Sequence, residues 1–257
     1  MNTHRLRRID FKDAALRQTL YRRRYLIPHA VTLGNMFCGF LAVIYSTSFR
    51  FEKAAVAIVL AIVLDGLDGR VARKLNATSK FGVEFDSFSD LVSFGIAPAV
   101  LVYNWCFKVP ADEFGVLVTF IFALCGASRL ARFNIADENL KSFSGLPTPG
   151  AAAAVAGLIY CVPDPGISLL WCLVAAILML SLAFLMVSKI EYMSIKQLRL
   201  GNIRAIGKVG LGVLIALIWY NPKIGLLVLG LSYAYSSPIY IAWKRFRGAD
   251  QAAISKV

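Results

Sequence analysis

Four aspartates lie in one short stretch of the chain, between residues 64 and 90. Asp65 and Asp68 are three residues apart and Asp86 and Asp90 are four apart, so in helices each pair projects from a single face. Four carboxylates gathered near a bilayer repel one another and are poorly solvated unless positive charge lies between them. The stretch therefore predicts a site for divalent metal.

An all-oxygen site of this kind suits Mg²⁺ or Mn²⁺, and Mg²⁺ usually shares its coordination sphere with substrate phosphates. Two such ions would offset the four negative charges and still attract a pyrophosphate. The alternative is that the aspartates cap helices or pair with Arg70, Arg73 and Lys74. A cap uses one aspartate at a helix start, which does not account for two pairs that each share a face.

Small and polar residues accompany the aspartates. Gly69 and Ala72 leave room for a ligand to approach the backbone, and Arg73 can grip a phosphate or carboxylate with two hydrogen bonds. Thr32 and Asn35 lie three residues apart near the start of the first apolar run, so they face one way. Ligand binding, helix capping and packing between helices all remain open for this pair.

Two arginines end the fourth apolar run, in the stretch SRLARFN. Arg129 and Arg132 share a helical face and can hold an anionic group, either the phosphate of a lipid nucleotide or the carboxylate of an amino acid. Asn134 lies beside them. Anchoring to anionic lipid headgroups is the alternative. In the Gly- and Pro-rich loop that follows, Lys141 and Ser144 are candidates for closing over a substrate, or the loop is a plain connection.

The helices that carry these residues are expected to lie in a membrane. Of the 257 residues 58 % are hydrophobic and the mean hydropathy is +0.65, which is too apolar for an ordinary soluble domain. With about 20 residues needed to cross the hydrocarbon core, the apolar runs predict an all-α polytopic protein with about eight transmembrane helices. The predicted spans are residues 30–48, 54–72, 84–106, 114–134, 149–163, 167–187, 207–220 and 222–243.

Positive charge is distributed unevenly over the connections between these spans. If both termini are cytoplasmic, the cytoplasmic segments hold 24 of the 28 Lys and Arg residues, so the aspartates lie on the cytoplasmic side, where nucleotides are. The net charge of +13 then indicates contact with anionic membrane lipids and no nucleic-acid partner. Five cysteines without a CxxC pair indicate buried thiols, with no disulfide framework or zinc site.

Eight residues of the aspartate stretch also reproduce, without gap or substitution, the pattern D-x2-D-G-x2-A-R-x8-G-x3-D-x3-D. The chain thereby resembles the CDP-alcohol phosphatidyltransferase family. The eight fixed positions are Asp65, Asp68, Gly69, Ala72, Arg73, Gly82, Asp86 and Asp90. One departure from the family is His29, where Asn commonly follows the proline, so a nucleotide role for that position stays open.

The resemblance implies transfer of a phosphatidyl group from CDP-diacylglycerol to an alcohol, with release of CMP, at a two-metal site on a six-helix core. It implies that Asp65, Asp68 and Asp86 are metal ligands, and that Asp90 is the general base and can also touch metal. The candidates for binding CDP-diacylglycerol are Thr32, Asn35, Gly69, Ala72, Arg73 and Gly82.

The motif does not choose the acceptor alcohol. Four further stretches, TLGNMFCGFLAV, FDSFSDLVSFGIAPA, SRLARFN and SGLPTPGAAA, are similar to those of bacterial and archaeal members that use L-serine, which favours L-serine and a prokaryotic inner or plasma membrane. Glycerol-3-phosphate, inositol phosphate and choline are the alternatives. The candidates for binding serine or phosphate are Arg129, Arg132, Asn134, Lys141 and Ser144.

A transporter or channel with the aspartates as an ion site is the alternative outside the family, but the sequence holds no second copy of the motif, as inverted repeats would.

The spans after residue 149 carry hardly any charge, which indicates packing and contacts within a homodimer. The expected organisation is a basic cytoplasmic segment with an amphipathic interfacial helix or a disordered tail at residues 1–28, a transmembrane catalytic domain at 29–243 and a basic cytoplasmic tail at 244–257.

Overall fold

The computed structural model describes residues 29–75, 79–109, 111–135, 145–166, 168–190, 192, 216–217 and 219–254. All secondary structure in these ranges is helical. The predicted interfacial helix at residues 1–28 lies outside the described residues, as do Lys141 and Ser144.

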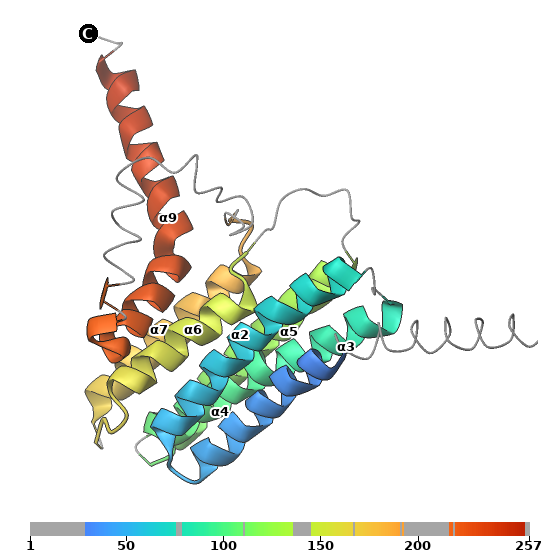
Figure 1. Cartoon of the computed structure of the whole chain (residues 1–257). Helices are drawn as coiled ribbons and strands as arrows, with labels where there is room; N and C mark the ends of the chain where they lie inside the picture. The colour runs from blue at the N-terminus through green and yellow to red at the C-terminus, as the bar shows by residue number, and fades with distance from the viewer. Residues whose placement is uncertain are drawn as a thin grey trace, which may run out of the picture.

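Helices account for almost all of the described chain (Figure 1). The first helix spans His29–Thr47 and is followed by α2 (Phe51–Leu75), α3 (Lys80–Asp90), the π-helix η1 (Leu91–Ile96), α4 (Ala97–Val102), the π-helix η2 (Tyr103–Phe107), α5 (Asp112–Ile135), α6 (Thr148–Cys161), α7 (Leu169–Val187) and α9 (Pro222–Ile254). A tight turn at Phe49, which has a φ of 57°, reverses the chain between the first helix and α2.

The third span is one continuous helical rod, from α3 through η2, with two π-helical segments. It begins at Ser79, whose Oγ accepts a hydrogen bond from the Gly82 N–H over 3.0 Å. The first π-segment begins directly after Asp90 and ends where the Ala97 N–H donates to Val92 O, just before Pro98, which has no N–H to donate. π-helical turns are often found at functional sites, and this one lies directly beside the aspartates.

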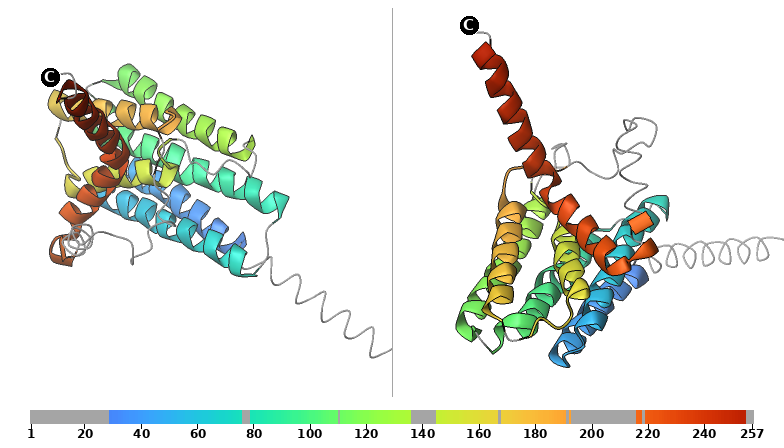
Figure 2. Two further views of the ribbon diagram at one scale, coloured as in Figure 1. Left: turned by 90° about the horizontal axis from the view of Figure 1, so that it is seen from above. Right: turned by 90° about the vertical axis from the view of Figure 1, so that its left-hand side faces the viewer.

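The helices pack side by side in one bundle, and α9 projects beyond it (Figures 1 and 2). Helix α6 contacts both α2 and α9, and α5 packs against α7 and η1. Small residues let α6 and α9 approach closely: a Cβ on Gly157 would lie 2.8 Å from Leu227 Cα, and one on Gly230 would lie 2.7 Å from Ala154 Cα. The buried core is correspondingly rich in alanine, mostly on α2, α4, α6 and α7.

The predicted all-α membrane architecture is confirmed. Five described helices are long and apolar enough to cross a bilayer: His29–Thr47, Lys80–Phe107, Asp112–Ile135, Leu169–Val187 and Pro222–Ile241. Helix α6 is apolar but shorter, and α2 runs beside them while carrying Asp65, Asp68 and Arg70 towards its end. The predicted span at 207–220 lies mostly outside the described residues, so the count of about eight stays a prediction.

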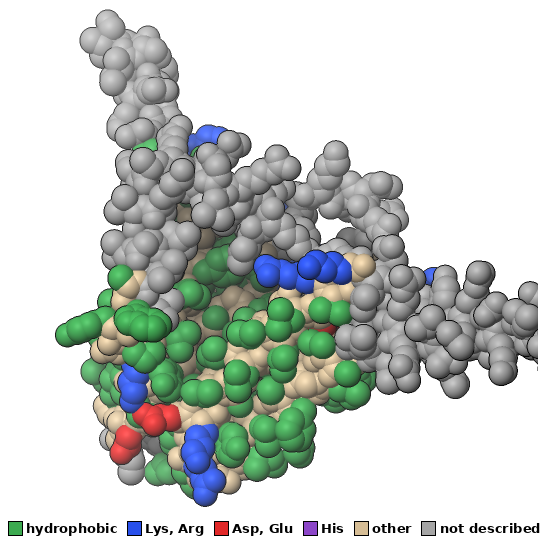
Figure 3. All heavy atoms as spheres, viewed as in Figure 1, with side chains coloured by type: hydrophobic (Ala, Val, Ile, Leu, Met, Phe, Trp, Pro, Cys, Tyr) green, Lys and Arg blue, Asp and Glu red, His purple; other side chains and the backbone are tan. Residues whose placement is uncertain are grey.

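The surface fits a lipid environment. Figure 3 shows hydrophobic side chains covering one face of the bundle, with Lys and Arg side chains towards its two ends. Many large apolar residues are exposed, among them Leu33, Phe37, Phe120 and Phe184. All five cysteines are free thiols; the predicted burial holds for Cys106 and Cys172, whereas Cys38, Cys125 and Cys161 are only partly buried.

Candidate metal and substrate site

The aspartates of α2 and α3 meet at one end of the bundle. Carboxylate oxygens of Asp65, Asp68 and Asp86 all lie within 4.8 Å of one another. Asp68 is buried, and the other two are partly buried. Asp90, one turn beyond Asp86, lies close enough to all three for their charges to interact. Faces of two successive helices thus form one acidic cluster.

The first helix supplies hydrogen bonds to two of these carboxylates. Thr32 Oγ1 donates to Asp68 Oδ2 over 3.2 Å, and Asn35 Nδ2 donates to Asp90 Oδ1 over 3.3 Å. Thr32 is 7 % exposed and Asn35 is fully buried. Of the roles that the sequence left open for this pair, the geometry favours positioning of the aspartates, because both side chains hydrogen-bond to the acidic cluster.

Two serines fix the register of the first helix against the third span. Ser89 Oγ donates to Thr32 O over 3.2 Å, and Ser93 Oγ donates to Asn35 O over 3.0 Å. At Gly39, an added Cβ would lie only 2.7 Å from the Ser93 Cα, so glycine is required for this close approach. The serines were not predicted as site residues, although their spacing of four places both on one helical face.

The acidic cluster suits a hard divalent cation. All of its donors are carboxylate oxygens, the ligands that Mg²⁺ and Mn²⁺ prefer. Asp86 Oδ1 is buried, and none of the described residues hydrogen-bonds to it. A buried carboxylate oxygen without a donor is unfavourable unless something else satisfies it. A cation held by Asp65, Asp68 and Asp86 would meet that need.

The small residues of the motif lie beside this cluster. Gly69 directly follows Asp68 in α2, and Gly82 lies in the first turn of α3. A Cβ on Gly82 would lie 3.1 Å from Ser79 Oγ and 3.7 Å from the His29 ring, which itself stacks on Phe81. Gly82 therefore leaves room for the helix cap and for His29. Ala72 and Arg73 lie in the last turns of α2, and their side chains are outside the described part of the structure.

Arg129 and Arg132 have different surroundings, although they lie on one helix. Arg129 is largely buried and lies within electrostatic range of Asp90 and of Tyr233 on α9. Arg132 donates from Nη1 to Val187 O over 3.1 Å and from Nη2 to Met186 O over 3.4 Å, at the last carbonyls of α7. These bonds satisfy carbonyls that a helix end leaves unpaired. Of the two arginines, Arg129 is therefore the one directed towards the acidic cluster.

Asn134 links α5 to α3. Its Nδ2 donates to Glu84 Oε2 over 3.2 Å, and its Oδ1 accepts from Ser87 Oγ over 3.1 Å. These contacts lie on the exposed side of α3. Asn134 therefore holds α5 and α3 together next to the turns of these helices that carry site residues.

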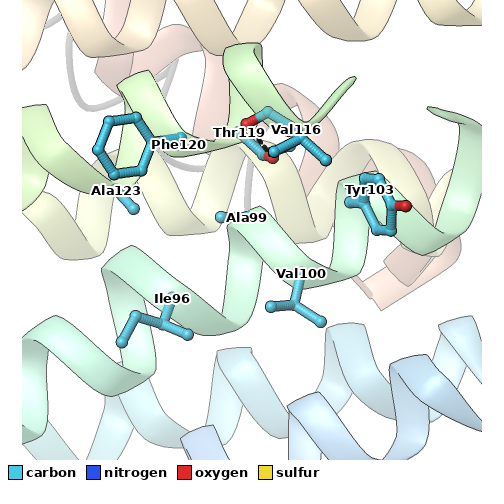
Figure 4. Close-up of a pocket in the computed structure, with 8 residues that line it drawn as sticks. All are labelled: Ile96, Ala99, Val100, Tyr103, Val116, Thr119, Phe120 and Ala123. Atoms are coloured by element: carbon cyan, nitrogen blue, oxygen red, sulfur yellow. Dashed lines mark hydrogen bonds between the residues drawn. The ribbon is translucent and has the colours of Figure 1, made fainter. Parts of the chain in front are cut away.

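A separate hollow lies on the described surface. It is a groove of about 260 Å³ between the third span and α5, lined mainly by apolar side chains such as Ile96, Val116 and Phe120 (Figure 4). It holds none of the predicted site residues.

Comparison with known proteins agrees with the motif. The model of the CDP-alcohol phosphatidyltransferase family matches residues 25–188. CDP-diacylglycerol–serine O-phosphatidyltransferase of Helicobacter pylori (strain J99) is 44 % identical over 133 residues, which cover 51 % of this chain and 56 % of that protein. The proteins of the same name from Bacillus subtilis and Methanocaldococcus jannaschii are 37 % and 40 % identical, over 66 % of this chain and 92 % and 75 % of their own lengths.

The match thus spans little more than half the length of the Helicobacter pylori protein but nearly all of the Bacillus subtilis protein. The segment matched by the family model contains the whole acidic cluster, together with Thr32, Asn35 and Arg129. It ends just after α7, so α9 lies outside it. On the strength of the family match, of these relatives and of the uninterrupted motif, the chain belongs to the CDP-alcohol phosphatidyltransferase family.

Proposed function

We propose that this protein transfers the phosphatidyl group of CDP-diacylglycerol to the hydroxyl of L-serine, giving phosphatidylserine and CMP. The observation that carries the proposal is the meeting of the Asp65, Asp68 and Asp86 oxygens within 4.8 Å, with Asp90 beside them, in a chain of this family. The relatives' printed names support L-serine as the acceptor. The reaction then takes place at the membrane surface, on the side that the Lys and Arg distribution makes cytoplasmic.

Asp65, Asp68 and Asp86 would hold Mg²⁺ or Mn²⁺, two ions by the charge of the cluster. When bound, such ions neutralise the pyrophosphate of the nucleotide and the charge that develops during transfer. Gly69 would let the nucleotide approach the backbone beside Asp68, with Ala72 and Arg73 on the following turn of α2 and Gly82 in the first turn of α3. Arg73 would pair with phosphate.

Asp90 would accept the proton of the acceptor hydroxyl. The serine oxygen forms a bond to the phosphorus that carries diacylglycerol, the bond from that phosphorus to the CMP oxygen breaks, and the hydroxyl proton passes to the Asp90 carboxylate. Asn35 holds that carboxylate from one side, and Arg129 lies within electrostatic range on the side of α5. A base must be oriented before it can act, which gives Asn35 a positioning role.

A panel of acceptors tests the proposal. Purified protein is supplied with labelled CDP-diacylglycerol and Mg²⁺ or Mn²⁺, and CMP release is measured with L-serine, glycerol-3-phosphate, inositol phosphate or choline. We expect release with L-serine and formation of phosphatidylserine. Release with another acceptor alone would keep the family chemistry and refute serine as substrate, whereas no release with any acceptor would refute the transferase reaction itself.

A further inference from the structure

Besides Asn35 Oδ1 and Asp86 Oδ1, two further buried polar atoms of the described residues lack hydrogen-bond partners, one on α5 and one at the start of α6. Arg129 Nε and Thr148 Oγ1 are both buried, and no described residue hydrogen-bonds to either. Thr148 is 1 % exposed. Buried donors of this kind are costly unless a ligand satisfies them. The Arg129 side chain is also positively charged, and no described residue accepts a hydrogen bond from its Nε–H group.

Thr148 lies at the start of α6, against the turn of α5 that precedes Arg129. A Cβ on Gly126, three residues before Arg129 on α5, would lie 3.8 Å from the Thr148 methyl carbon Cγ2. The methyl group therefore packs against α5, and the hydroxyl occupies the other branch of the Thr148 Cβ. Because α6 begins here, the partial positive charge of its N-terminus adds to that of the guanidinium.

Tyr233 of α9 closes the same region. A Cβ on Gly150, two residues after Thr148, would lie 2.5 Å from Tyr233 Cε1, so the tyrosine ring lies directly against the first turn of α6. The Tyr233 phenol is also within electrostatic range of Arg129. Its position is braced by Tyr192, whose hydroxyl donates to Ala234 O over 2.8 Å. Burial raises the pKa of Tyr192 to about 12, which keeps that donor protonated.

We propose that Arg129, Thr148 and Tyr233 form the pocket for the carboxylate of the acceptor amino acid. The inference rests on the proposed function and adds two residues to it, Thr148 and Tyr233. Arg129 supplies the charge, Thr148 donates its hydroxyl, and the Tyr233 hydroxyl completes the set of donors. A carboxylate accepts several hydrogen bonds at once, which matches three donors from three helices.

The position of the pocket suits the reaction. Arg129 is within electrostatic range of Asp90, the proposed base, so a carboxylate held at Arg129 leaves the hydroxyl of the same small molecule near that base. Tyr233 lies on α9, outside the segment that the family model matches. Acceptor choice would then depend partly on a helix outside that segment, which explains why the shared motif alone does not identify the alcohol.

The test measures KM for L-serine and for CDP-diacylglycerol in Thr148→Val, which removes the hydroxyl and nearly keeps the shape. Thr148→Ser keeps the hydroxyl and serves as the rescue variant. Thr119→Val is the matched control, because Thr119 is buried in α5 with its hydroxyl bonded to Gly115 O over 2.7 Å. Tyr233→Phe repeats the measurement from a different helix.

We expect Thr148→Val to raise the KM for L-serine about tenfold or more, the loss for one hydrogen bond to a charged group. The KM for CDP-diacylglycerol should stay near the wild-type value, which also shows that the variant is folded. Thr148→Ser and Thr119→Val should behave like wild type, and Tyr233→Phe should raise the serine KM. Ethanolamine, which lacks the carboxylate, should react equally well with wild type and Thr148→Val.

Three outcomes overturn the inference. An unchanged serine KM in both Thr148→Val and Tyr233→Phe, with wild type active on serine, refutes the pocket and leaves the proposed function intact. A raised KM for CDP-diacylglycerol instead of serine shows that these donors hold a nucleotide or lipid phosphate. Failure of the wild-type protein to use L-serine refutes the proposed function, and with it the carboxylate ligand.

Discussion

The hydrogen bond from Asn35 to Asp90 allows a sharp test of the proposed base. Asn35 is fully buried, and its Nδ2 donates to Asp90 Oδ1 over 3.3 Å. The substitution Asn35→Leu keeps the volume of the side chain nearly constant and removes the donor. The Asp90 carboxylate then loses the contact that orients it from the first helix, while the proposed metal ligands Asp65, Asp68 and Asp86 keep all of their oxygens.

The expected magnitude follows from the length of that bond. A hydrogen bond to a charged group contributes about 1.5–3 kcal/mol, and 3.3 Å is slightly beyond the usual range for N–H···O bonds, so the lower value applies. A loss of about 1.5 kcal/mol in the transition state slows the reaction about tenfold. We therefore expect kcat to fall about tenfold in Asn35→Leu. Both KM values should change by less than about threefold, since the bond orients the base and does not hold substrate.

Asn104→Leu is the matched control. Asn104 joins the same two spans at the opposite end of the bundle, where its Nδ2 donates to Ser46 Oγ and to Val100 O, each over 3.0 Å. Kinetics of CMP release and thermal unfolding in detergent are measured for both variants. Asn104→Leu should lower the midpoint of unfolding and leave kcat near wild type. An equal fall of kcat in both variants, or a kcat within about twofold of wild type in Asn35→Leu, would refute the positioning role.

Three further predictions follow from the same geometry. Excess EDTA should abolish CMP release, and full turnover in EDTA would refute the metal site. Mg²⁺ at 100 times its Kd should stabilise the folded state by about 2.7 kcal/mol and so raise the midpoint of unfolding. Asp65→Asn should lose metal-dependent nucleotide binding as well as turnover, whereas Asp90→Asn should keep most of the binding and lose the chemical step, as titration with CDP-diacylglycerol would show. Gly39→Ala should destabilise the protein by about 1–3 kcal/mol, because the added methyl group would meet the Ser93 backbone. Gly66 has open space around it, so Gly66→Ala should be neutral or stabilising in the same unfolding assay.

The acidic cluster could be predicted from the sequence because its four aspartates lie close together in the chain. Helical spacing alone assigns Asp65 with Asp68, and Asp86 with Asp90, to common faces, and a short connection brings α2 and α3 together. The positions of most spans followed from apolar length in the same way, since a bilayer imposes one thickness on every helix. The π-helical segments were not predicted. They depend on how Pro98 and the neighbouring helices accommodate one extra residue in a turn, which no periodicity reveals.

The other half of the site depends on contacts between distant segments. Arg129 and Arg132 look equivalent in the sequence, yet only the structure shows that Arg132 caps α7 while Arg129 lies within electrostatic range of Asp90. Thr148 and Tyr233 are 85 residues apart, and nothing in either local sequence indicates that Tyr233 packs against the first turn of α6. That packing depends on Gly150, which lets the ring of Tyr233 lie against α6. Such a contact is specified by the packing of two helices, not by a motif.

The acidic cluster is locally unfavourable, and that is an argument for its function. The described hydrogen bonds from the first helix to it, from Thr32 and Asn35, measure 3.2 and 3.3 Å, and Asp86 Oδ1 has no donor among the described residues. Bonds of this length offset little of the repulsion between buried carboxylates. A fold selected for stability alone would replace such a cluster with apolar side chains, as the rest of this alanine-rich core does. The site instead keeps negative charge that a divalent cation can neutralise, and the cation in turn can attract a pyrophosphate. The unfavourable repulsion between the carboxylates is therefore consistent with binding of metal and nucleotide.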